Sequence, residues 1–309
     1  MDSKIRIGIV GYGNLGRGVE LAVAQNADMQ LAAVFTRRDS GGVRLQMAGV
    51  PVHGMDDIAR HCAAIDVLIL CGGSKDDLPV QGPQLARLCT TVDSFDTHAK
   101  IPEHFDAVDA AAKAGGHVAL ISIGWDPGLF SLQRLMGEAL LPQGATYTFW
   151  GKGLSQGHSD AVRRVPGVQG GVQYTIPSEE AIERVRSGER PQLNTRDKHV
   201  RECFVVLAPD ADADAVRQTI VTMPDYFADY DTTVHFIGAE ELARDHGAMP
   251  HGGFVIRSGG TGVAGETHQT VEFSLKLGSN PEFTASVLVA YARAAHRLSQ
   301  QGERGAQLV

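Results

Sequence analysis

The feature that most constrains the fold of this chain is a glycine-rich turn near its N-terminus. Residues 11–16, Gly11-Tyr12-Gly13-Asn14-Leu15-Gly16, directly follow the apolar run 5–10 and open a segment, 14–25, whose apolar residues recur at helical spacing. Between a strand and a helix, such glycines allow a tight turn, a close approach of the backbone to a pyrophosphate, and close helix–strand packing. The first N–H groups of the helix bind phosphate. We therefore expect all six residues to contact a dinucleotide.

The end of the next predicted strand indicates which dinucleotide is bound. About 20 residues past the last glycine, chains that use NAD usually carry Asp or Glu, which binds the ribose 2′-hydroxyl. This chain carries Thr36, Arg37 and Arg38 there. A carboxylate would repel a 2′-phosphate, whereas guanidinium groups pair with it. The sequence therefore predicts NADP(H), held in part by these three residues.

The first third of the chain alternates strands with helices. Apolar runs at 5–10, 31–35, 66–70, 90–93 and 117–123 predict strands, and 14–25, 76–88 and 103–114 predict helices. This alternation is typical of a parallel sheet with helices on both faces. We therefore expect a Rossmann-type, doubly wound α/β domain.

From Gly124 onward the pattern changes to closely spaced strands. They are predicted at 145–150, 169–175, 201–207, 232–237, 252–257 and 268–277, with helices at 178–187 and 213–223. We expect a second, α+β domain with a mostly antiparallel sheet. The predicted helix 281–300 would pack back on the first domain, and 302–309 is expected to be weakly structured. The dinucleotide-binding domain would then comprise 1–124 and 279–309, and a substrate-binding and dimerisation domain 125–278.

Composition narrows the class of protein. The net charge of −8 is unfavourable for nucleic-acid binding, which needs a basic face. No apolar stretch approaches the ~20 residues of a membrane-spanning helix, and we find no secretion signal. Cys62, Cys71, Cys89 and Cys203 form no Cys-x-x-Cys pair, and the 12 histidines form no metal-binding motif, so no metal is expected. Free thiols are expected in a reducing cytoplasm.

Polar residues follow three of the predicted strands. Ligands of open α/β sheets bind outside the carboxyl ends of the strands. We expect Cys71, Gly72 and Ser74 to contact the cofactor, and Asp96 and Asp126 to lie at its nicotinamide end. Two carboxylates suit a cationic group such as an ammonium. Asp126 precedes Pro127, however, and this pair is also typical of a helix start.

Several longer segments are more specific than the glycine turn. They are 124–128, 149–160, 173–179, 223–227, 249–253 and 280–286, and they include both tryptophans of the chain, Trp125 and Trp150. Through these segments, and through 10–16, 35–38 and 93–98, the sequence resembles the meso-diaminopimelate D-dehydrogenase family over nearly its whole length.

The resemblance implies an NADP-dependent, reversible oxidative deamination. The D centre of meso-2,6-diaminopimelate becomes the ketone of L-2-amino-6-oxopimelate, which cyclises to tetrahydrodipicolinate, and ammonia is released. The reductive direction would supply diaminopimelate for lysine and peptidoglycan. The resemblance also implies a homodimer.

The resemblance further implies two ends of the substrate site. At the reacting D centre, Asp96 and Asp126 would hold the amino group, and one of them would accept its proton. The carboxylate of this centre would be bound by the backbone N–H groups of Gln156 and Gly157, with Trp125 and Trp150 as walls. The distal L centre would be bound by Thr175, Arg201, His251 and Asn280. Arg201 can hold a carboxylate with two parallel N–H bonds.

Simpler interpretations exist for some of these residues. An arginine on a strand often covers apolar surface, His251 lies in a glycine-rich loop, and Asn280 before Pro281 is typical of a helix cap. Two other functions are also open. One is another NADP-linked reductase of the aspartate pathway, such as dihydrodipicolinate reductase or homoserine dehydrogenase. The other is a non-catalytic protein that senses NADP with the same fold.

Overall fold

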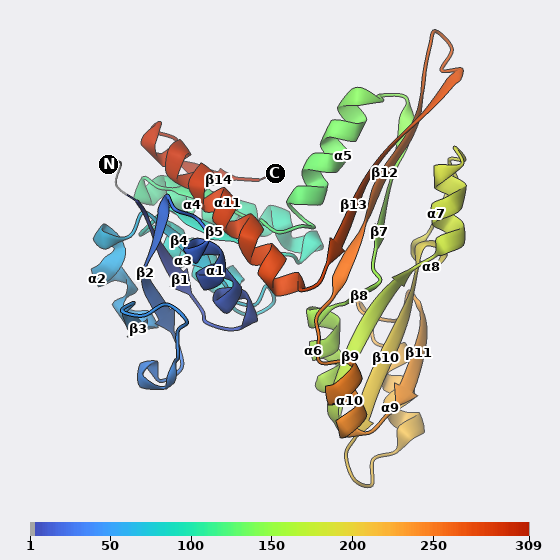
Figure 1. Ribbon diagram of the computed structural model, residues 1–309, viewed down its shortest axis with the longest axis horizontal. Helices are drawn as coiled ribbons and strands as arrows, with labels where there is room; N and C mark the ends of the chain where they lie inside the picture. The colour runs from blue at the N-terminus through green and yellow to red at the C-terminus, as the bar shows by residue number, and fades with distance from the viewer. Residues whose placement is uncertain (1–3, 309) are drawn as a thin grey trace. The chain divides into compact units, whose positions relative to one another are not determined.

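The computed structural model describes residues 4–308, which form two compact units. Unit 1 consists of the chain up to Leu132 and from Pro281 onward, and unit 2 consists of Gln133–Asn280. Figure 1 labels the helices and strands of both. Helix α5 (Leu129–Leu140) begins in unit 1 and ends in unit 2. The assignment of cofactor binding to unit 1 and of substrate binding to unit 2 is a prediction.

Unit 1 contains a seven-stranded sheet in the order β14-β6-β5-β4-β1-β2-β3. All of its neighbouring strands are parallel, as the alternating pattern predicted. The strands are β1 (Ile5–Val10), β2 (Met29–Thr36), β3 (Val52–Gly54), β4 (Val67–Leu70), β5 (Thr91–Asp93), β6 (Val118–Leu120) and β14 (Gly305–Gln307).

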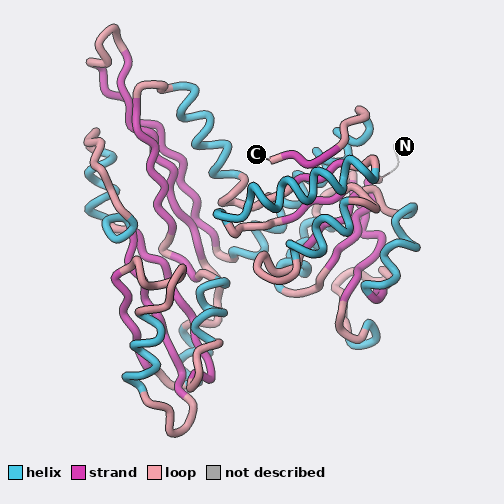
Figure 2. Tube along the Cα trace, turned by 180° about the vertical axis from the view of Figure 1, so that it is seen from behind, coloured by secondary structure: helices cyan, strands magenta, loops and turns pink. Residues whose placement is uncertain are grey.

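Helices cover both faces of this sheet. They are α1 (Asn14–Ala24), α2 (Ile58–His61), α3 (Leu78–Ala86), α4 (Ile101–Gly115) and α11 (Asn280–Gln300). One core joins Ile7 and Ile9 to Val19 of α1 and Leu288 of α11. Another core joins β2 and β4 to α2 and α3, and Figures 1 and 2 show α1 and α11 lying together across the sheet. The doubly wound α/β fold is confirmed.

The C-terminal segment is more ordered than the sequence suggested. Gly305 pairs with Val118 as β14 extends the sheet in parallel beside β6. The Ala306 N–H also donates to Asp109 Oδ1 at 2.9 Å. The prediction of weak structure is therefore wrong for 305–307, because a backbone ladder and a helix carboxylate hold a segment that has no apolar pattern of its own. Val309 lies outside the described residues.

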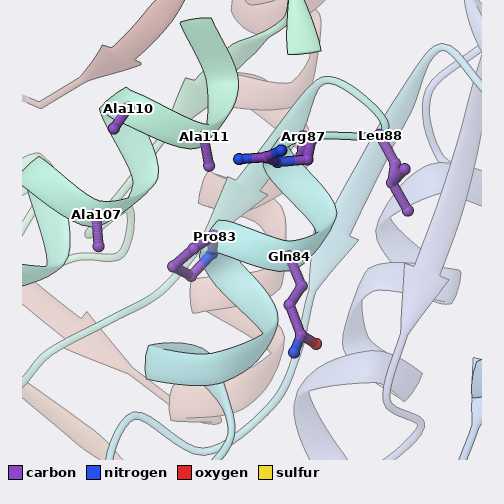
Figure 3. Close-up of a pocket in the computed structure, with 7 residues that line it drawn as sticks. All are labelled: Pro83, Gln84, Arg87, Leu88, Ala107, Ala110 and Ala111. Atoms are coloured by element: carbon purple, nitrogen blue, oxygen red, sulfur yellow. The ribbon is translucent and has the colours of Figure 1, made fainter. Parts of the chain in front are cut away.

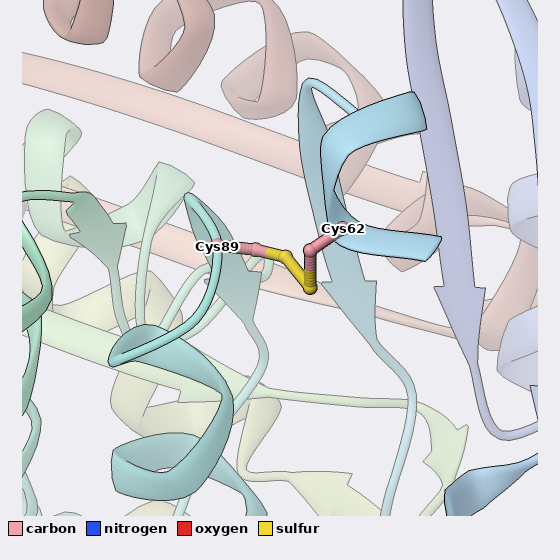
Figure 4. Close-up of a disulfide and its surroundings, with 2 residues drawn as sticks. All are labelled: Cys62 and Cys89. Carbon is pink, nitrogen blue, oxygen red and sulfur yellow. A yellow bond between two sulfur atoms is a disulfide. The ribbon is translucent and has the colours of Figure 1, made fainter. Parts of the chain in front are cut away.

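Two of the four cysteines form a disulfide. Cys62 follows α2 and Cys89 follows α3, and their Cα atoms lie 6.0 Å apart (Figure 4). The prediction of four free thiols is wrong for this pair, because packing of α2 and α3 on one face of the sheet brings together residues that are 27 positions apart. The other two cysteines, Cys71 and Cys203, are free.

Unit 2 contains two sheets instead of the one expected. Their orders are β11-β10-β9-β8 and β13-β12-β7. All neighbours are antiparallel except β10 and β11, and β12 and β13 form a long hairpin that is clear in Figure 2. The strands are β7 (Gly144–Trp150), β8 (Gly153–Leu154), β9 (Val168–Pro177), β10 (His199–Leu207), β11 (Asp231–Phe236), β12 (His251–Thr261) and β13 (Thr267–Leu277).

Five helices pack on these sheets. They are α6 (Gln156–Arg163), α7 (Glu179–Arg186), α8 (Thr195–Lys198), α9 (Ala213–Val221) and α10 (Ala239–Asp245). Val162 of α6 and Ile220 of α9 share a core with β10, and Ile182 of α7 packs against the three-stranded sheet. Within residues 4–308, no helix combines the length and apolar character that crossing a bilayer requires.

Candidate cofactor and substrate sites

The glycine turn of unit 1 has the geometry expected for a phosphate-binding loop. Gly11 has φ +89°, a left-handed conformation that favours glycine. A side chain at Gly16 would place its Cβ 2.2 Å from the Gly11 carbonyl oxygen, so only glycine lets α1 start this close to β1. A Cβ at Gly13 would meet no atom within 4 Å. The turn is therefore tight on its protein side and open at Gly13.

Beside the turn lies a basic hollow of about 290 Å³, lined by Tyr12, Arg17, Arg38, Gly42, Val43, Arg44 and Gln46. Its three arginines fit a phosphate, because guanidinium groups pair with phosphate oxygens. The Arg38 guanidinium donates to the Tyr12 carbonyl, and the Arg38 N–H donates to Thr36 Oγ1 at 3.1 Å.

For three arginines, the sequence did not predict correctly whether they line this hollow. Arg37 is not among its lining residues; it is 70% exposed and pairs with Asp77 at 2.8 Å. Sequence reasoning missed Arg17 and Arg44. Arg17 was detectable, since it directly follows the glycine turn, but Arg44 lies in a loop without a motif.

A buried carboxylate braces one wall of the hollow. Glu20 of α1 is fully buried; one carboxylate oxygen accepts from the Tyr12 hydroxyl and the other from the Met47 N–H, at 2.6 Å for the latter. Burial and this hydrogen bond raise the pKa of Tyr12 well above its usual value. Glu20 thus ties the glycine turn to the loop that carries Arg44.

The polar residues predicted at the carboxyl ends of the strands lie on neighbouring strands. Ser74 follows β4 and accepts the N–H of Asp96, which follows β5, at 3.1 Å. Asp126 is half-buried, and the helix that follows it begins only at Leu129. The alternative that Asp126 caps a helix with Pro127 as its first residue is therefore wrong. Trp125 is 9% exposed and packs edge-on against Phe130.

In unit 2, Arg201 is a buried cation. It is 4% exposed, its guanidinium donates to Thr175 Oγ1, and its Cζ lies 3.9 Å from the centre of the Tyr230 ring. Its Nε has no hydrogen-bond partner, and no carboxylate among residues 4–308 forms an ion pair with it. Burial lowers the pKa of Arg201 from its ordinary value. The arginine does not cover a surface, so the simpler interpretation is wrong.

Three histidines lie within the electrostatic reach of Arg201. Burial, and then the charge of Arg201, lower the pKa of His158 and of His199 to about 3. For His251, burial and the Arg201 charge outweigh a hydrogen bond to Gly252 and lower the pKa to about 4. All three rings are therefore neutral at pH 7. We call Arg201, Thr175, Tyr230 and these three histidines the Arg201 cluster.

Trp150 is attached to this cluster through its backbone. Its N–H donates to His199 Nε2 at 2.8 Å, and its ring stacks on the His199 ring with the centroids 5.2 Å apart. His251 is placed by β12, and the Gly252 N–H donates to its Nδ1 at 2.8 Å. Sequence reasoning missed His199 and Tyr230 and left His158 undecided, since no motif marks these three residues.

The start of α6 presents backbone donors. Ser155 caps the helix, and its hydroxyl bonds His158 Nδ1 at 2.8 Å. Gln156 and Gly157 are the first helical residues, whose N–H groups have no acceptor within a helix. A Cβ at Gly157 would meet no atom within 4 Å. Met249 links this region to Asn280, whose N–H donates to the Met249 carbonyl at 2.9 Å.

The chain is similar to known proteins over nearly its whole length. Residues 124–279 match the family model described as the diaminopimelic acid dehydrogenase C-terminal domain. Over 99% of this chain and 93% of the relative, the sequence is 64% identical to a meso-diaminopimelate D-dehydrogenase of Lysinibacillus sphaericus. The chain belongs to the meso-diaminopimelate D-dehydrogenase family. The resemblance read from the sequence is thus confirmed, and the alternative of another aspartate-pathway reductase is wrong.

Solved structures of the family agree with the fold. The Corynebacterium glutamicum diaminopimelate dehydrogenase in complex with DAP is 48% identical, with a TM-score of 0.93 over 99% of this chain and 93% of that one. An engineered D-amino acid dehydrogenase bound to NADP+ is 47% identical, with a TM-score of 0.89 over 99% and 93% of the two chains. The chain is therefore an NADP-dependent amino-acid dehydrogenase.

One hollow in unit 1 is lined by none of the predicted site residues. An open hollow of about 460 Å³ lies between α3 and α4 (Figure 3). It is lined by Pro83, Gln84, Arg87, Leu88, Ala107, Ala110 and Ala111. Arg87 is its one charged lining residue, and none of the predicted site residues lies there. It offers no pair of groups that could carry acid–base chemistry.

Proposed function

We propose that this chain oxidatively deaminates meso-2,6-diaminopimelate at its D centre, reversibly and with NADP+. Water adds to the imine that hydride loss leaves, and the products are ammonia and L-2-amino-6-oxopimelate, which cyclises to tetrahydrodipicolinate. One observation carries the choice of substrate: Arg201 is a buried guanidinium whose Nε has no hydrogen-bond partner and which pairs with no carboxylate of residues 4–308. A buried charge is costly unless it is paired. Its partner is therefore supplied by the ligand, as a second carboxylate far from the reacting centre.

The distal L centre is bound by Thr175, Arg201, His251 and Asn280. Thr175 faces Arg201 in the register of β9 and β10 and already accepts a bond from its guanidinium. Because His251 is neutral at pH 7, it can accept a hydrogen bond from an ammonium group or donate one to a carboxylate without adding charge. We assign the distal carboxylate to Arg201 on these grounds.

The reacting D centre is held by two carboxylates and by backbone N–H groups. Asp96 and Asp126 bind its ammonium group, and the N–H groups of Gln156 and Gly157 bind its carboxylate, as helix N-termini do. Trp125 and Trp150 form walls. Asp96 or Asp126 accepts the proton that the ammonium must lose before hydride can leave the D carbon.

NADP+ is held by the glycine turn and the basic hollow. Gly13 leaves room for a pyrophosphate, and Arg38, Arg17 and Arg44 offer three guanidinium groups to the 2′-phosphate. When bound, the cofactor takes up the hydride of the D centre. Thr36 positions Arg38 through its hydroxyl, Cys71, Gly72 and Ser74 border the cofactor at the end of β4, and Arg37 acts from the rim.

The protein acts as a homodimer in this proposal. Leu135, Met136 and Leu140 lie on one side of α5 and are 64%, 59% and 62% exposed. Such a stripe of large apolar side chains on a helix marks an interaction surface. Light scattering should give twice the mass of one chain, and Met136→Glu should lower it; a wild-type monomer would contradict the assignment.

The test of function is NADP+ reduction with stereoisomers of diaminopimelate. We expect turnover with the meso isomer and none with the LL isomer, since only a D centre reacts. Turnover of LL-diaminopimelate, or NADPH binding without turnover of any isomer, would contradict the proposal. Replacing NADP+ by NAD+ in the same assay tests the cofactor assignment.

A further inference from the structure

Asp93, the last residue of β5, bonds two different loops at once. It is 2% exposed. Its Oδ1 accepts the N–H of Phe95 at 3.0 Å and the N–H of Ser122 at 2.9 Å. Its backbone oxygen also accepts the N–H of Ile123 at 2.8 Å. One residue therefore fixes the backbone after β5 to the backbone after β6.

The second oxygen of Asp93 is supported from α4. Asp93 Oδ2 lies 2.9 Å from His104 Nε2, and His104 is 5% exposed. The His104 ring stacks on Phe95, with centroids 4.2 Å apart and planes at 19°. A Cβ at Gly82 of α3 would lie 2.8 Å from His104 Cε1, so this glycine makes room for the imidazole. The carboxylate is thus held rigidly on every side that the structure describes.

Both bonded loops carry a proposed site carboxylate. Asp96 follows Phe95 directly, and Asp126 lies four residues after Ser122. Ser122 has φ +58°, a left-handed conformation that non-glycine residues rarely adopt and that needs support from its surroundings. Asp93 supplies that support. A change in either bond would move Asp96 against Asp126.

We infer that Asp93, supported by His104, is a positioning residue that sets the geometry of the Asp96–Asp126 pair. The inference rests on the proposed function, in which these two carboxylates share the ammonium of the D centre. Orientation matters strongly there, because a displacement of about 1 Å can cost roughly 10²-fold in rate. Asp93 itself is buried beneath the loops and does not need to touch the substrate.

The experiment compares Asp93→Ala with Asp93→Asn. The amide of Asn retains an oxygen for the two N–H groups, so we expect Asn to keep kcat within about tenfold of wild type and Ala to lower it by about 10²-fold. Both values are taken per NADP+-binding site, which removes unfolded protein from the comparison. The dissociation constant for NADP+ should stay unchanged, and the deuterium isotope effect at the D carbon should rise in Asp93→Ala as hydride transfer becomes slower.

The matched control is Asp66→Ala. Asp66 Oδ2 also accepts a backbone N–H in unit 1, from Arg6 at 2.7 Å, but at the opposite end of the sheet. It should lower stability and leave kcat per site and the isotope effect at wild-type values. Unchanged kcat and isotope effect in Asp93→Ala would overturn the inference.

A second variant keeps the test decisive if Asp93→Ala does not fold. His104→Leu removes the support of Oδ2 and leaves both Oδ1 bonds available; we expect kcat per site to fall and the isotope effect to rise. If kcat per site and the isotope effect of His104→Leu both equal the wild-type values, the inference is overturned. If wild-type protein reduces NADP+ with meso-diaminopimelate but these variants behave like wild type, only the inference fails. If wild-type protein shows no such turnover, the proposed function fails first and the inference falls with it.

Discussion

Replacing Arg201 by Met separates a binding role of this arginine from a structural one. Met has a similar length and no charge, so it fills the same space beside Thr175 and Tyr230. In the proposed site the substitution leaves the distal carboxylate of the substrate without its cation. We expect substrate turnover to fall while the folded protein is not weakened.

The expected change in kcat/KM is larger than the expected change in folding stability. Removing one partner of a buried ion pair costs about 3–5 kcal/mol, which corresponds to a loss of roughly 10²- to 5 × 10³-fold in kcat/KM. Without ligand, the same arginine is buried and has no ionic partner. Replacing buried ions by apolar side chains often stabilises a protein by about 1–4 kcal/mol. The lost hydrogen bond to Thr175 and the lost contact with Tyr230 offset roughly 1–3 kcal/mol of this, so the two contributions nearly cancel and the melting temperature should change little.

The assay compares two substrates that share the reacting centre. D-lysine equals meso-diaminopimelate without the distal carboxylate. Arg201→Met should lower kcat/KM for meso-diaminopimelate by roughly 10²- to 5 × 10³-fold and leave the value for D-lysine nearly unchanged. Arg257→Met is a matched control, since Arg257 is also buried but bonds the carbonyl oxygens of Leu141 and Pro142. It should lower the melting temperature.

Two outcomes would refute this reasoning. Equal loss of kcat/KM for both substrates would show that Arg201 does not bind the distal end. A clear fall of the melting temperature in Arg201→Met, similar to that in Arg257→Met, would show that the arginine is a structural residue.

Three further predictions concern the other groups of the site. Asp96→Asn or Asp126→Asn should lower kcat/KM by about 10²–10⁴-fold without changing NADP+ affinity, and both values within a few-fold of wild type would contradict the acid–base role. Arg44→Ala should raise KM for NADP+ by about tenfold and leave KM for NAD+ unchanged, whereas Arg87→Ala should change neither. The histidines of the Arg201 cluster have folded pKa values of about 3 to 4, below the unfolded value near 6.5. Because the unfolded chain binds more protons as the pH falls, stability should be full above about pH 6.5 and fall toward pH 4, by on the order of 2 kcal/mol per histidine at pH 5; a melting temperature constant between pH 7 and 5 would contradict the buried neutral state.

Local patterns in the sequence were enough for much of the fold. The glycine turn, β1 and α1 were predictable because neighbouring residues along the chain decide whether a tight turn and an amphipathic helix form. The longer helices α5 and α6 were not predicted. The short helices α2, α8 and α10 and the short strands β3 and β8 were also missed, because elements of this length bury too few residues to leave a periodic pattern.

The site was predictable only where a motif records it. Asp96, Asp126, Arg38 and Arg201 came from the sequence, the last through resemblance alone. The sequence by itself predicts a dinucleotide at Gly11–Gly16, because that chemistry needs glycines at fixed positions within one short turn. Only the tertiary structure places Arg44 in the lining of the hollow beside this turn.

Tertiary structure also decided what surrounds Arg201. Neutral histidines from α6, β10 and β12 lie around it with Tyr230, and no carboxylate in the described part of the chain pairs with it. Whether a residue is buried depends on which elements pack together. An unpaired guanidinium is costly only when it is buried, and an anionic ligand then lowers that cost. The same holds for Asp93, whose bonds to Phe95 and Ser122 join residues that the sequence separates.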